Sequence, residues 1–374
     1  MAIDEIIPLL GRIVAGDNDR YCKKGKYIMP KVSLKSIDQV TTETLSVYGV
    51  LQGTIDVILK TFHYANRCGI TTHGIRRLPM YVEKIEAGHL NPKDEVEAVI
   101  DSDAVAVLDA KGGFGQVAAQ YAVNLALEKA TKYGISAVGV RNSNNFGTAG
   151  YYGDYAARHG MAAFVFANAA PAIAPTGGKK TIFGTNPICF AFPGSDKNNP
   201  IVLDMATTIA ARSKIRLAAK NGEKIPMDWA IGSDGKPTDD PNEALKGSLL
   251  PMAGYKGYGL SLFMDVFAGL LAGSSYAGRV KPLTNLEADS GNGHLFVLID
   301  TKRFMSEEEL HIKVDYFYEA VKSCGDEGAV MLPGEPGYRK MAEQIDAVVI
   351  SEKEFESVNE VASKLGVVAR LEEV

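Results

Sequence analysis

Apolar residues recur at helical spacing in the first part of the chain. Between residues 36 and 67 they include Val40, Leu45, Val47, Val50, Leu51, Ile55, Val57, Ile58 and Leu59. This spacing predicts a helical N-terminal segment, and the Cys68-Gly69 pair is typical of a helix stop. The predicted helix therefore delivers the chain to the polar turn Thr71-Thr72-His73-Gly74.

Strand and helix patterns alternate in the next segment. A short apolar strand is predicted at Ala104–Leu108, an alanine-rich helix at Val117–Tyr133, and a second strand at Ile135–Val140. These three elements form one β-loop-α-β unit, so the middle of the chain is expected to be α/β.

Turn signals dominate the chain after Met161. Strands are predicted at residues 162–166, 188–192 and 201–203, and the Pro and Gly clusters between them leave little room for helices. This density of turns predicts antiparallel or mixed strands. Residues 209–250 are polar and are expected to be rich in loops.

The last third of the chain returns to longer elements. A helical apolar pattern covers residues 257–271, a strand is predicted at residues 294–299, and Ser306 begins a helix with Glu309 in the capping-box position. Single cores rarely grow beyond about 250–300 residues. The 374 residues are therefore expected to form two domains.

Composition and charge exclude several classes of protein. The formal net charge is −5, and Lys and Arg are scattered, so no basic stripe is present for a nucleic acid. Apolar runs such as residues 259–273 are shorter than the roughly 20 apolar residues that cross a bilayer. Asp4 and Glu5 stand where a secretory leader carries bases, which favours a cytoplasmic location.

The cysteines suggest no special chemistry. The four residues lie far apart with no CxxC pair. This spacing predicts free thiols, with neither a metal site nor a disulfide framework.

A possible nucleotide-binding fingerprint lies at Gly113–Ala118. The segment fits G-x-G-x-x-A between a predicted strand and a predicted helix, which is the context that a dinucleotide pyrophosphate needs. The second strand, however, runs into Arg141 and not into an acidic residue for the ribose hydroxyls. An arginine there could favour a 2′-phosphate, but a tight turn without a ligand explains the glycines about as well.

An ordered series of motifs resembles the malate/L-lactate dehydrogenase-like family, which includes malate, L-sulfolactate and ureidoglycolate dehydrogenases and a diketogulonate reductase. The motifs are Thr72–Tyr81 with Gly88 and Asn91-Pro92, Asn142–Tyr152, Gly184–Pro187, Asp204–Thr208, Ile225-Pro226 with Trp229-Ala230, Gly235–Pro241, Gly254–Gly259 and Leu332–Glu335. So many segments in one order are hard to produce by chance.

The resemblance implies a fold unlike that of the Rossmann dehydrogenases, with an α/β architecture of the α+β type. In this fold NAD or NADP lies on a mostly antiparallel or mixed sheet in a central domain, and the enzyme is a homodimer. The implied central cofactor domain covers residues 101–250, with a returning strand at about 294–299. Residues 1–100 form a helical substrate domain with about 251–285 and the C-terminal helices. Gly113–Gly115 then become a structural turn.

His73 is the candidate acid and base. Oxidising an alcohol by hydride transfer leaves a proton to remove, and histidine titrates near neutral pH. His73 lies in a polar turn, where a merely solvated histidine is the alternative, and the family motif places its proton donor and acceptor there. Asp204 ends an apolar strand; the resemblance implies that it pairs with this histidine, whereas the simpler alternative is an Asx turn leading into Ala206.

The candidate substrate residues follow in the same segment. A substrate carboxylate needs a fixed cation, and arginine offers a planar fork. Arg77 matches the family's substrate-binding arginine, and Tyr81 follows four residues later on the same face if the segment is helical. The alternative for Arg76 and Arg77 is an exposed basic pair, and of the two Arg77 is preferred.

The resemblance also assigns three segments to the cofactor. Lys256, with Tyr255 before it, matches a lysine that contacts the cofactor and lies in a glycine-rich turn before an apolar helix. A solvated loop lysine is the alternative. The other two segments are the residues after Asp204, namely Met205, Ala206, Thr207 and Thr208, and the stretch Gly334, Glu335 and Pro336.

One position departs from the family pattern. Many members carry N-S-x-H-F-G, and ureidoglycolate-type enzymes assign that histidine the proton-accepting role, whereas this chain has Asn145. Asn145 can hydrogen-bond a substrate but cannot titrate. The acid-base work is thereby narrowed to His73, and His159, His294 and His311 are interpreted as structural.

The sequence therefore predicts an NAD- or NADP-dependent dehydrogenase of a small 2-hydroxy acid, with malate preferred and L-lactate or sulfolactate as neighbours. A cyclic imine reductase of the same family is one alternative, in which the same histidine would protonate nitrogen. A non-catalytic nucleotide-binding relative is another. Asn145 favours the latter, whereas the intact His73, Asp204, Arg77 and Lys256 oppose it.

Overall fold

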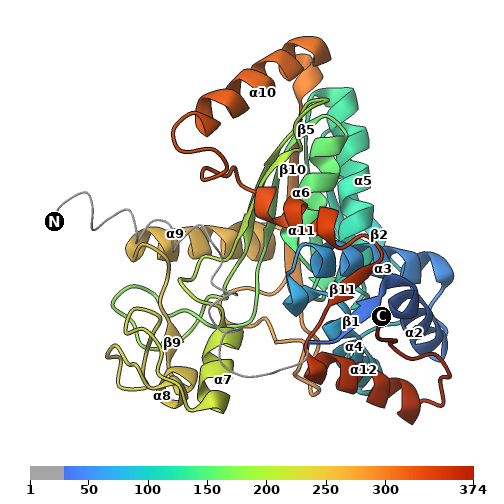
Figure 1. Ribbon diagram of the computed structural model, residues 1–374, viewed down its shortest axis with the longest axis vertical. Coiled ribbons are helices and arrows are strands. Elements are labelled where there is room, and N and C mark those ends of the chain that lie inside the picture. Colours follow the sequence, from blue (N-terminus) through green and yellow to red (C-terminus); the bar gives the residue numbers. More distant parts are fainter. Residues whose placement is uncertain (1–28) are drawn as a thin grey trace.

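The computed structural model describes residues 29–374 (Figure 1). Cys22 and the N-terminal acidic residues lie outside these residues. Helices from both ends of the chain build one lobe, in which β1 (Lys31–Ser33) pairs antiparallel with β11 (Ala347–Val349). The helices of this lobe are α2 (Leu34–Ser46), α3 (Gln52–Arg67), α4 (Leu78–Glu86) and α12 (Glu352–Lys364).

The predicted N-terminal helical segment is two helices, because the chain turns between α2 and α3. Gly49 has a φ of +72°, and the Tyr48 and Val50 amides both donate to the Leu45 carbonyl. Only glycine adopts this left-handed conformation without strain. Val47 and Leu51 fall in or next to this turn and stay exposed, although their spacing extends the helical pattern.

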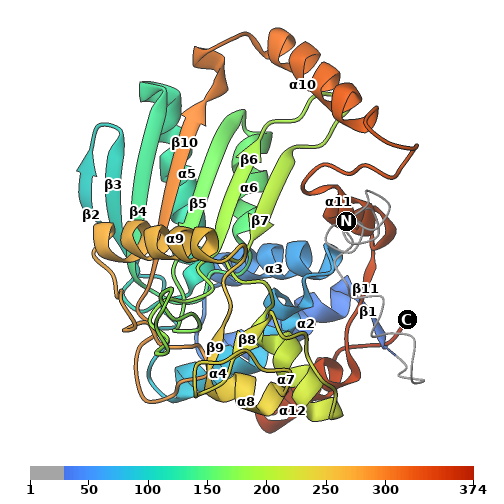
Figure 2. The same ribbon diagram turned by 90° about the vertical axis from the view of Figure 1, so that its left-hand side faces the viewer.

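A seven-stranded sheet forms the centre of the molecule, in the order β2-β3-β4-β10-β5-β6-β7 (Figure 2). The parallel pair is β3 with β4, and the other neighbours are antiparallel. The predicted mixed, mostly antiparallel sheet is confirmed. The strands are β2 (Glu97–Ser102), β3 (Val105–Asp109), β4 (Ile135–Ser143), β5 (Met161–Ala167), β6 (Ile188–Phe192), β7 (Ile201–Met205) and β10 (Asn292–Asp300).

Two helices cover one face of this sheet, α5 (Gly115–Tyr133) and α6 (Ala149–Arg158). Alanine makes up half of the buried residues of α5, and such small side chains let the helix lie close to β4. The β3-α5-β4 unit was predicted, whereas β2 and α6 were not. The strand β2 is exposed along its length and so lacks an apolar pattern.

The other face of the sheet is covered only at its ends (Figure 2). The helix α9 (Tyr255–Met264) crosses the lower end and continues into the π-helical segment η4 (Asp265–Leu271), so the single helix predicted at residues 257–271 changes type midway. The helix α10 (Glu307–Lys322) stands above the upper end, and the Ser306 hydroxyl accepts from the Glu309 amide as the capping position predicts. Between them Phe190 and Phe192 remain partly exposed.

Residues 212–249, which were expected to be mostly loop, contain a small lobe. It holds α7 (Arg212–Asn221), β8 (Ala230–Ile231), α8 (Pro241–Lys246) and β9 (Ser248–Leu249) around a core that includes Ile173, Ile215 and Leu249. Elements this short carry too few apolar residues to show a periodic pattern. The remaining elements are η2 (Thr71–His73), η3 (Ile75–Arg77), η5 (Thr301–Arg303) and α11 (Glu335–Glu343).

The predicted domain boundary near residue 100 stays a prediction; β2 begins before it and belongs to the central sheet. Within residues 29–374 no helix combines the length and the apolar character that a membrane crossing requires.

Candidate active site

His73 ends a single 3-10 turn that follows α3. The turn is held by the backbone, where the His73 amide donates to the Ile70 carbonyl at 3.0 Å. Burial, followed by the positive charges of Arg77 and Arg76, lowers the pKa of His73 to about 3. The ring is therefore neutral at pH 7 and can accept a proton, although part of the side chain remains open to solvent.

Arg77 lies beside His73 and has donors to spare. Its Nε donates to the Thr72 carbonyl at 2.8 Å, and Nη1 meets the Met80 sulfur at 3.5 Å. No carboxylate pairs with it among residues 29–374, whereas Arg76 is more exposed and lies 3.8 Å from Glu354. Arg77, which the sequence analysis preferred over Arg76, is thus the arginine whose guanidinium is free to bind an anion.

Tyr81 is packed in the core of the helical lobe. Its ring stacks on Phe62 and meets Phe114 edge-on, and its hydroxyl accepts from Gln116 Nε2 at 2.5 Å. Gln116 is a functional neighbour that the sequence interpretation missed, because it occupies a variable position of the glycine motif. The hydroxyl proton of Tyr81 has no acceptor in the described part of the chain, so the predicted substrate contact stays a prediction.

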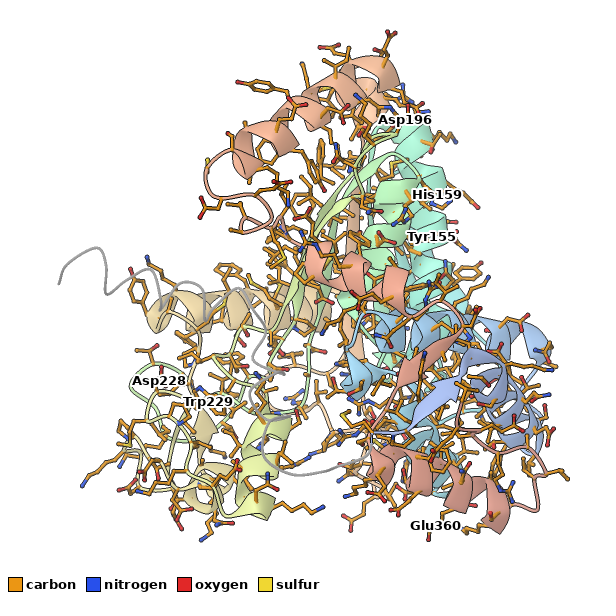
Figure 3. All side chains as sticks on the ribbon, in the orientation of Figure 1. Tyr155, His159, Asp196, Asp228, Trp229 and Glu360 are labelled. Carbon is orange, nitrogen blue, oxygen red and sulfur yellow. The ribbon has the colours of Figure 1, made fainter. Side chains whose placement is uncertain are left out.

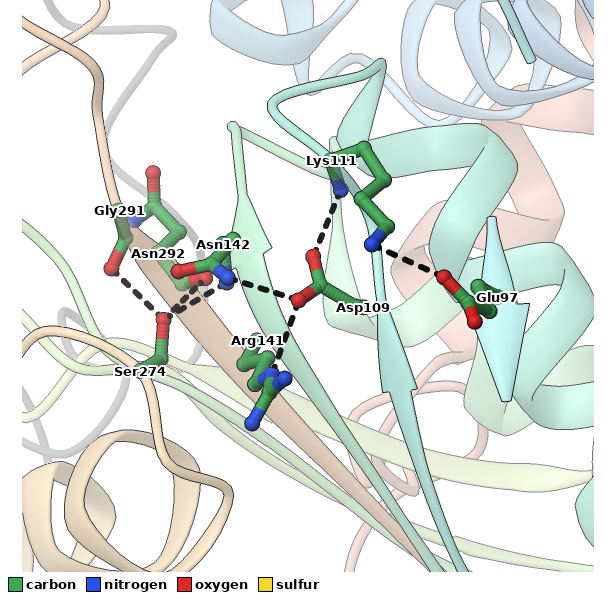
Figure 4. A network of polar contacts seen from close by, with 8 residues as sticks. All are labelled: Glu97, Asp109, Lys111, Arg141, Asn142, Ser274, Gly291 and Asn292. Carbon is green, nitrogen blue, oxygen red and sulfur yellow. Dashed lines mark hydrogen bonds and ion pairs between the residues drawn. The ribbon is translucent and has the colours of Figure 1, made fainter. Parts of the chain in front are cut away.

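Asn145 follows β4 in a loop that a polar network holds (Figure 4). Asp109 accepts from Arg141 Nε and Asn142 Nδ2, each at 3.0 Å, and from the Lys111 amide at 2.9 Å. Asn142 has a φ of +52°, a conformation that asparagine tolerates better than most residues. The network fixes the end of the strand, so the loop that carries Asn145 begins from a rigid base.

The glycines of the G-x-G segment make room for the backbone of this same loop. A Cβ at Gly115 would lie 2.3 Å from the Asn144 carbonyl oxygen and 2.5 Å from that of Asn145. In addition, Asn144 Nδ2 donates to the Gly112 and Gly113 carbonyls at 2.8 and 3.0 Å. The start of α5 is therefore occupied by protein backbone, which supports the interpretation of these glycines as a structural turn.

His294 also supports the loop. It is buried in β10, where Nε2 lies 3.0 Å from the Ser143 hydroxyl and the ring stacks on Phe146 at a centroid distance of 4.4 Å. Burial lowers its pKa to about 3, so it stays neutral. This placement fits the structural role expected for His294.

Asp204 holds the N-terminus of α6. Its Oδ2 accepts from the Gly150 amide at 2.7 Å, while no hydrogen bond or ion pair joins it to His73 within residues 29–374. Neither the expected pairing nor the Asx turn toward Ala206 is present, because the free amide at the helix start takes the carboxylate. Burial raises the pKa of Asp204 to about 6. The residue is nonetheless exposed to solvent.

Two of the segments expected at the cofactor meet at β7. The Val202 amide donates to the Pro333 carbonyl at 3.0 Å, which places the start of α11 against the strand that ends in Asp204 and Met205. Gly334 has a φ of +95° at this contact. Glu335 already accepts from Lys322 Nζ and the Leu332 amide, so its carboxylate is engaged within the protein.

The segment that contains Tyr255 and Lys256 is joined to residues 204–208 by backbone hydrogen bonds. The Thr207 amide and hydroxyl both donate to the Thr185 carbonyl at 2.9 Å, and the Thr207 carbonyl accepts from the Met252 amide. Met252 precedes the turn into α9, where a Cβ at Gly257 would lie 2.2 Å from the Met252 oxygen. Residues 204–208 and the start of α9 are thus tied together, with Tyr255 and Lys256 exposed on the first turn.

Comparison with known proteins identifies the family of this arrangement. Residues 32–359 match the family described as malate/L-lactate dehydrogenase. The chain belongs to this family. It is similar to the L-sulfolactate dehydrogenase of Methanocaldococcus jannaschii, with 38% identity over 326 residues that cover 87% of this chain and 94% of the relative. It is also similar to the malate dehydrogenase of Pyrococcus abyssi, with 36% identity over 351 residues, or 91% and 95% of the two chains.

The structural comparison agrees. The solved sulfolactate dehydrogenase of Methanocaldococcus jannaschii superimposes with a TM-score of 0.84 at 36% identity, covering 90% of this chain and 98% of that one. As a member of the malate/L-lactate dehydrogenase family, this chain is an oxidoreductase that acts on the CH–OH group of a 2-hydroxy acid. Relatives in the family use nicotinamide cofactors.

The residues of this dehydrogenase fit such a cofactor on two observations. Lys256 is exposed at the start of α9 and has no carboxylate partner in the described part of the chain, so its charge is available to a phosphate. The Thr208 hydroxyl is buried without a hydrogen-bond partner among the same residues. Buried polar groups are normally paired. An unpaired hydroxyl next to Asp204–Thr207 is therefore consistent with a ligand at this place.

A separate cavity of about 660 Å³ lies away from His73, between the end of α6, the β6–β7 loop and the start of α10. Figure 3 marks His159 and Asp196 on it. Its charged side chains are engaged with one another. Arg158 pairs with Asp154, Lys302 with Glu307, and His311 with Asp196. This cavity offers no vacant group for the dehydrogenase reaction.

Proposed function

We propose that the protein interconverts malate and its 2-oxo acid with NAD or NADP, with L-lactate and sulfolactate as neighbouring substrates. The observation that carries the proposal is the pair formed by a neutral His73 and an Arg77 without a carboxylate partner among residues 29–374. One residue can take a proton, and the other can hold a carboxylate a short distance along the chain. Similarity to dehydrogenases named for malate and sulfolactate supports the choice of a doubly anionic substrate.

Each step of the oxidation has a residue in this chain. Arg77 binds the substrate carboxylate, and Asn145 donates a hydrogen bond from Nδ2, since its Oδ1 already accepts from the Gly147 amide at 3.2 Å. His73 takes the hydroxyl proton while the carbon–oxygen double bond forms. A bound nicotinamide cofactor would supply the hydride acceptor for the same carbon. Lys256, Thr208 and the segment at Gly334 would hold that cofactor.

Substrate binding also adjusts the base. The positive charge of Arg77 is, after burial, the largest cause of the low pKa of His73. A carboxylate bound to Arg77 offsets this charge, so the pKa of His73 rises in the complex. His73 is thus unprotonated in the free enzyme, and in the substrate complex its higher pKa makes it a better acceptor for the hydroxyl proton.

A homodimer and a cytoplasmic location complete the proposal. Phe190 and Phe192 on β6 are 36% and 38% exposed, and Ile312 and Tyr316 on α10 are also exposed. Apolar surface of this extent is typical of an interface. The cytoplasmic location stays a prediction of the sequence.

An activity panel tests the proposed function. Purified protein is assayed with malate, L-lactate, sulfolactate and ureidoglycolate, and with cyclic imines in the reducing direction, each with both nicotinamide cofactors. We expect oxidation of malate to dominate and His73→Gln to abolish it. Turnover of imines alone would instead establish a reductase. Tight cofactor binding without turnover of any compound would establish a non-catalytic relative.

A further inference from the structure

Asn66 is a buried amide with no hydrogen-bond partner for its side chain. It lies in the last turn of α3 and is 1% exposed. Neither Oδ1 nor Nδ2 meets a partner within residues 29–374. Buried polar groups in native proteins are normally paired, so an unpaired amide needs an explanation.

The amide is pressed against the catalytic turn. A Cβ at Gly74 would lie 1.6 Å from Asn66 Oδ1 and 2.4 Å from its Cγ. Gly74 has a φ of −90°, so it does not lie in the left-handed region that favours glycine. The glycine after His73 is instead required because the Asn66 amide occupies the place of a side chain.

The neighbouring ring has an unpaired group as well. His73 Nδ1 is buried and has no partner in the described chain. The two unsatisfied groups therefore lie on neighbouring elements, the last turn of α3 and the turn η2, because the Asn66 amide contacts Gly74, the residue that follows His73. The charged groups that act on the ring are Arg77 and Arg76, and neither is an acceptor.

We propose that Asn66 is the positioning residue of His73, and that its Oδ1 accepts the hydrogen bond from Nδ1–H once the two side chains rotate toward each other. The hydrogen bond at one ring nitrogen decides which nitrogen keeps its lone pair. With Nδ1 protonated, Nε2 is left free to take the substrate proton. This inference rests on the proposed role of His73 as the base and assigns the part first expected of Asp204 to another residue.

The protonation of the ring can be measured without a substrate. In full-length protein labelled with ¹⁵N-histidine, the His73 signals are those lost in His73→Gln. We expect Nδ1 protonated and Nε2 unprotonated in the wild type. Asn66→Leu, which removes the acceptor at similar volume, should populate the other tautomer. Asn66→Asp should raise the titration midpoint of His73 by about one pH unit or more, because a carboxylate beside the ring favours the imidazolium.

A matched control and a kinetic measurement complete the test. Asn124 is exposed on α5, and Asn124→Leu should leave the His73 signals unchanged. With the substrate found in the panel, Asn66→Leu should lower kcat by about tenfold to a hundredfold with little change in cofactor affinity. His73 signals that are the same in wild type, Asn66→Leu and Asn66→Asp would overturn the inference.

Protein stability and function are separable in this design. If Asn66→Leu does not fold, the nearly isosteric Asn66→Asp decides the question alone. If the panel shows no turnover, the proposed function fails while the ring signals still report on Asn66. If His73 is needed for turnover but substitutions of Asn66 do not change its tautomer, this inference fails while the proposed function stands.

Discussion

Adjacent arginines have different surroundings, and this difference shapes the chemistry at the residue scale. Arg76 points to Glu354 on α12, while Arg77 turns toward the His73 turn and keeps free donors. Burial, together with the charges of these two arginines, lowers the pKa of His73 and holds its imidazole neutral, and only Arg77 is available to a ligand. In the free protein His73 is therefore an unprotonated base, and the neighbouring Arg77 can bind an anion.

Replacing Arg77 should separate these two effects. In Arg77→Gln we expect KM for the hydroxy acid to rise about tenfold to a hundredfold, as for the loss of a charged hydrogen bond of about 1.5–3 kcal/mol. The low-pH limit of kcat/KM should also move to higher pH, because the pKa of His73 rises. Steady-state kinetics across pH measures both. Arg76→Gln is the control, and equal effects of the two substitutions would contradict the assignment.

Asp204 predicts how stability depends on pH. Its pKa is raised from 3.8 to about 6, so the folded protein binds this proton more tightly than the unfolded chain. The contribution to the free energy of unfolding is present below about pH 4 and is lost as the pH rises through about 6. Asp204→Asn keeps an acceptor for the Gly150 amide but cannot ionise. Its melting temperature should exceed that of the wild type at pH 8 and match it near pH 4, and a difference that is the same at both pH values would refute this account.

At the scale of elements, α5 begins where the loop of Asn145 passes over it. The backbone of Asn144 and Asn145 fills the space beside Gly115. A side chain at Gly115 would therefore have to displace backbone that follows β4, and not the flexible end of a side chain. The glycine-rich turn and the substrate loop are thus one packed unit.

A comparison of two glycines tests this unit. Gly115→Ala should lower the free energy of unfolding by about 1–3 kcal/mol, as overpacking does. Gly53→Ala in α3 meets nothing within 4 Å and should raise it by about 0.5–1 kcal/mol. Chemical denaturation measures both. If Gly115→Ala kept wild-type stability and lost cofactor affinity, the segment would be a nucleotide-binding fingerprint after all.

Sequence patterns predicted the elements that have regular apolar faces. The strands β5, β6 and β7 and the helix α5 were found within a few residues of their observed ends, because each has a buried face. The exposed strand β2 and the π-helical change after Met264 were missed, since neither leaves a periodic signal. Asn66 was missed for another reason. Its importance depends on contact with Gly74, and such contacts across segments are invisible in one sequence.

At the scale of the whole molecule, residues 29–374 leave one face of the sheet open, and a second copy of the chain is the expected occupant. Phe190 stacks edge-on with Phe164 on this face at 5.4 Å. Phe190→Glu should shift the protein from dimer to monomer in sedimentation velocity. Tyr121, an aromatic residue 51% exposed on α5, offers the matched control Tyr121→Glu on the opposite side. A wild-type protein that sediments as a monomer would contradict the proposed dimer.

The pairing of β1 with β11 has a consequence for biosynthesis. The lobe that carries His73 is closed by residues 347–349 and by α12, against which the η3 turn packs. On the ribosome, the central sheet up to β10 can assemble while these segments are still inside the exit tunnel. The lobe that carries the base is therefore completed only after the segments that follow β10 have been synthesised, so we expect a chain truncated before β11 to keep the central sheet and to lose activity.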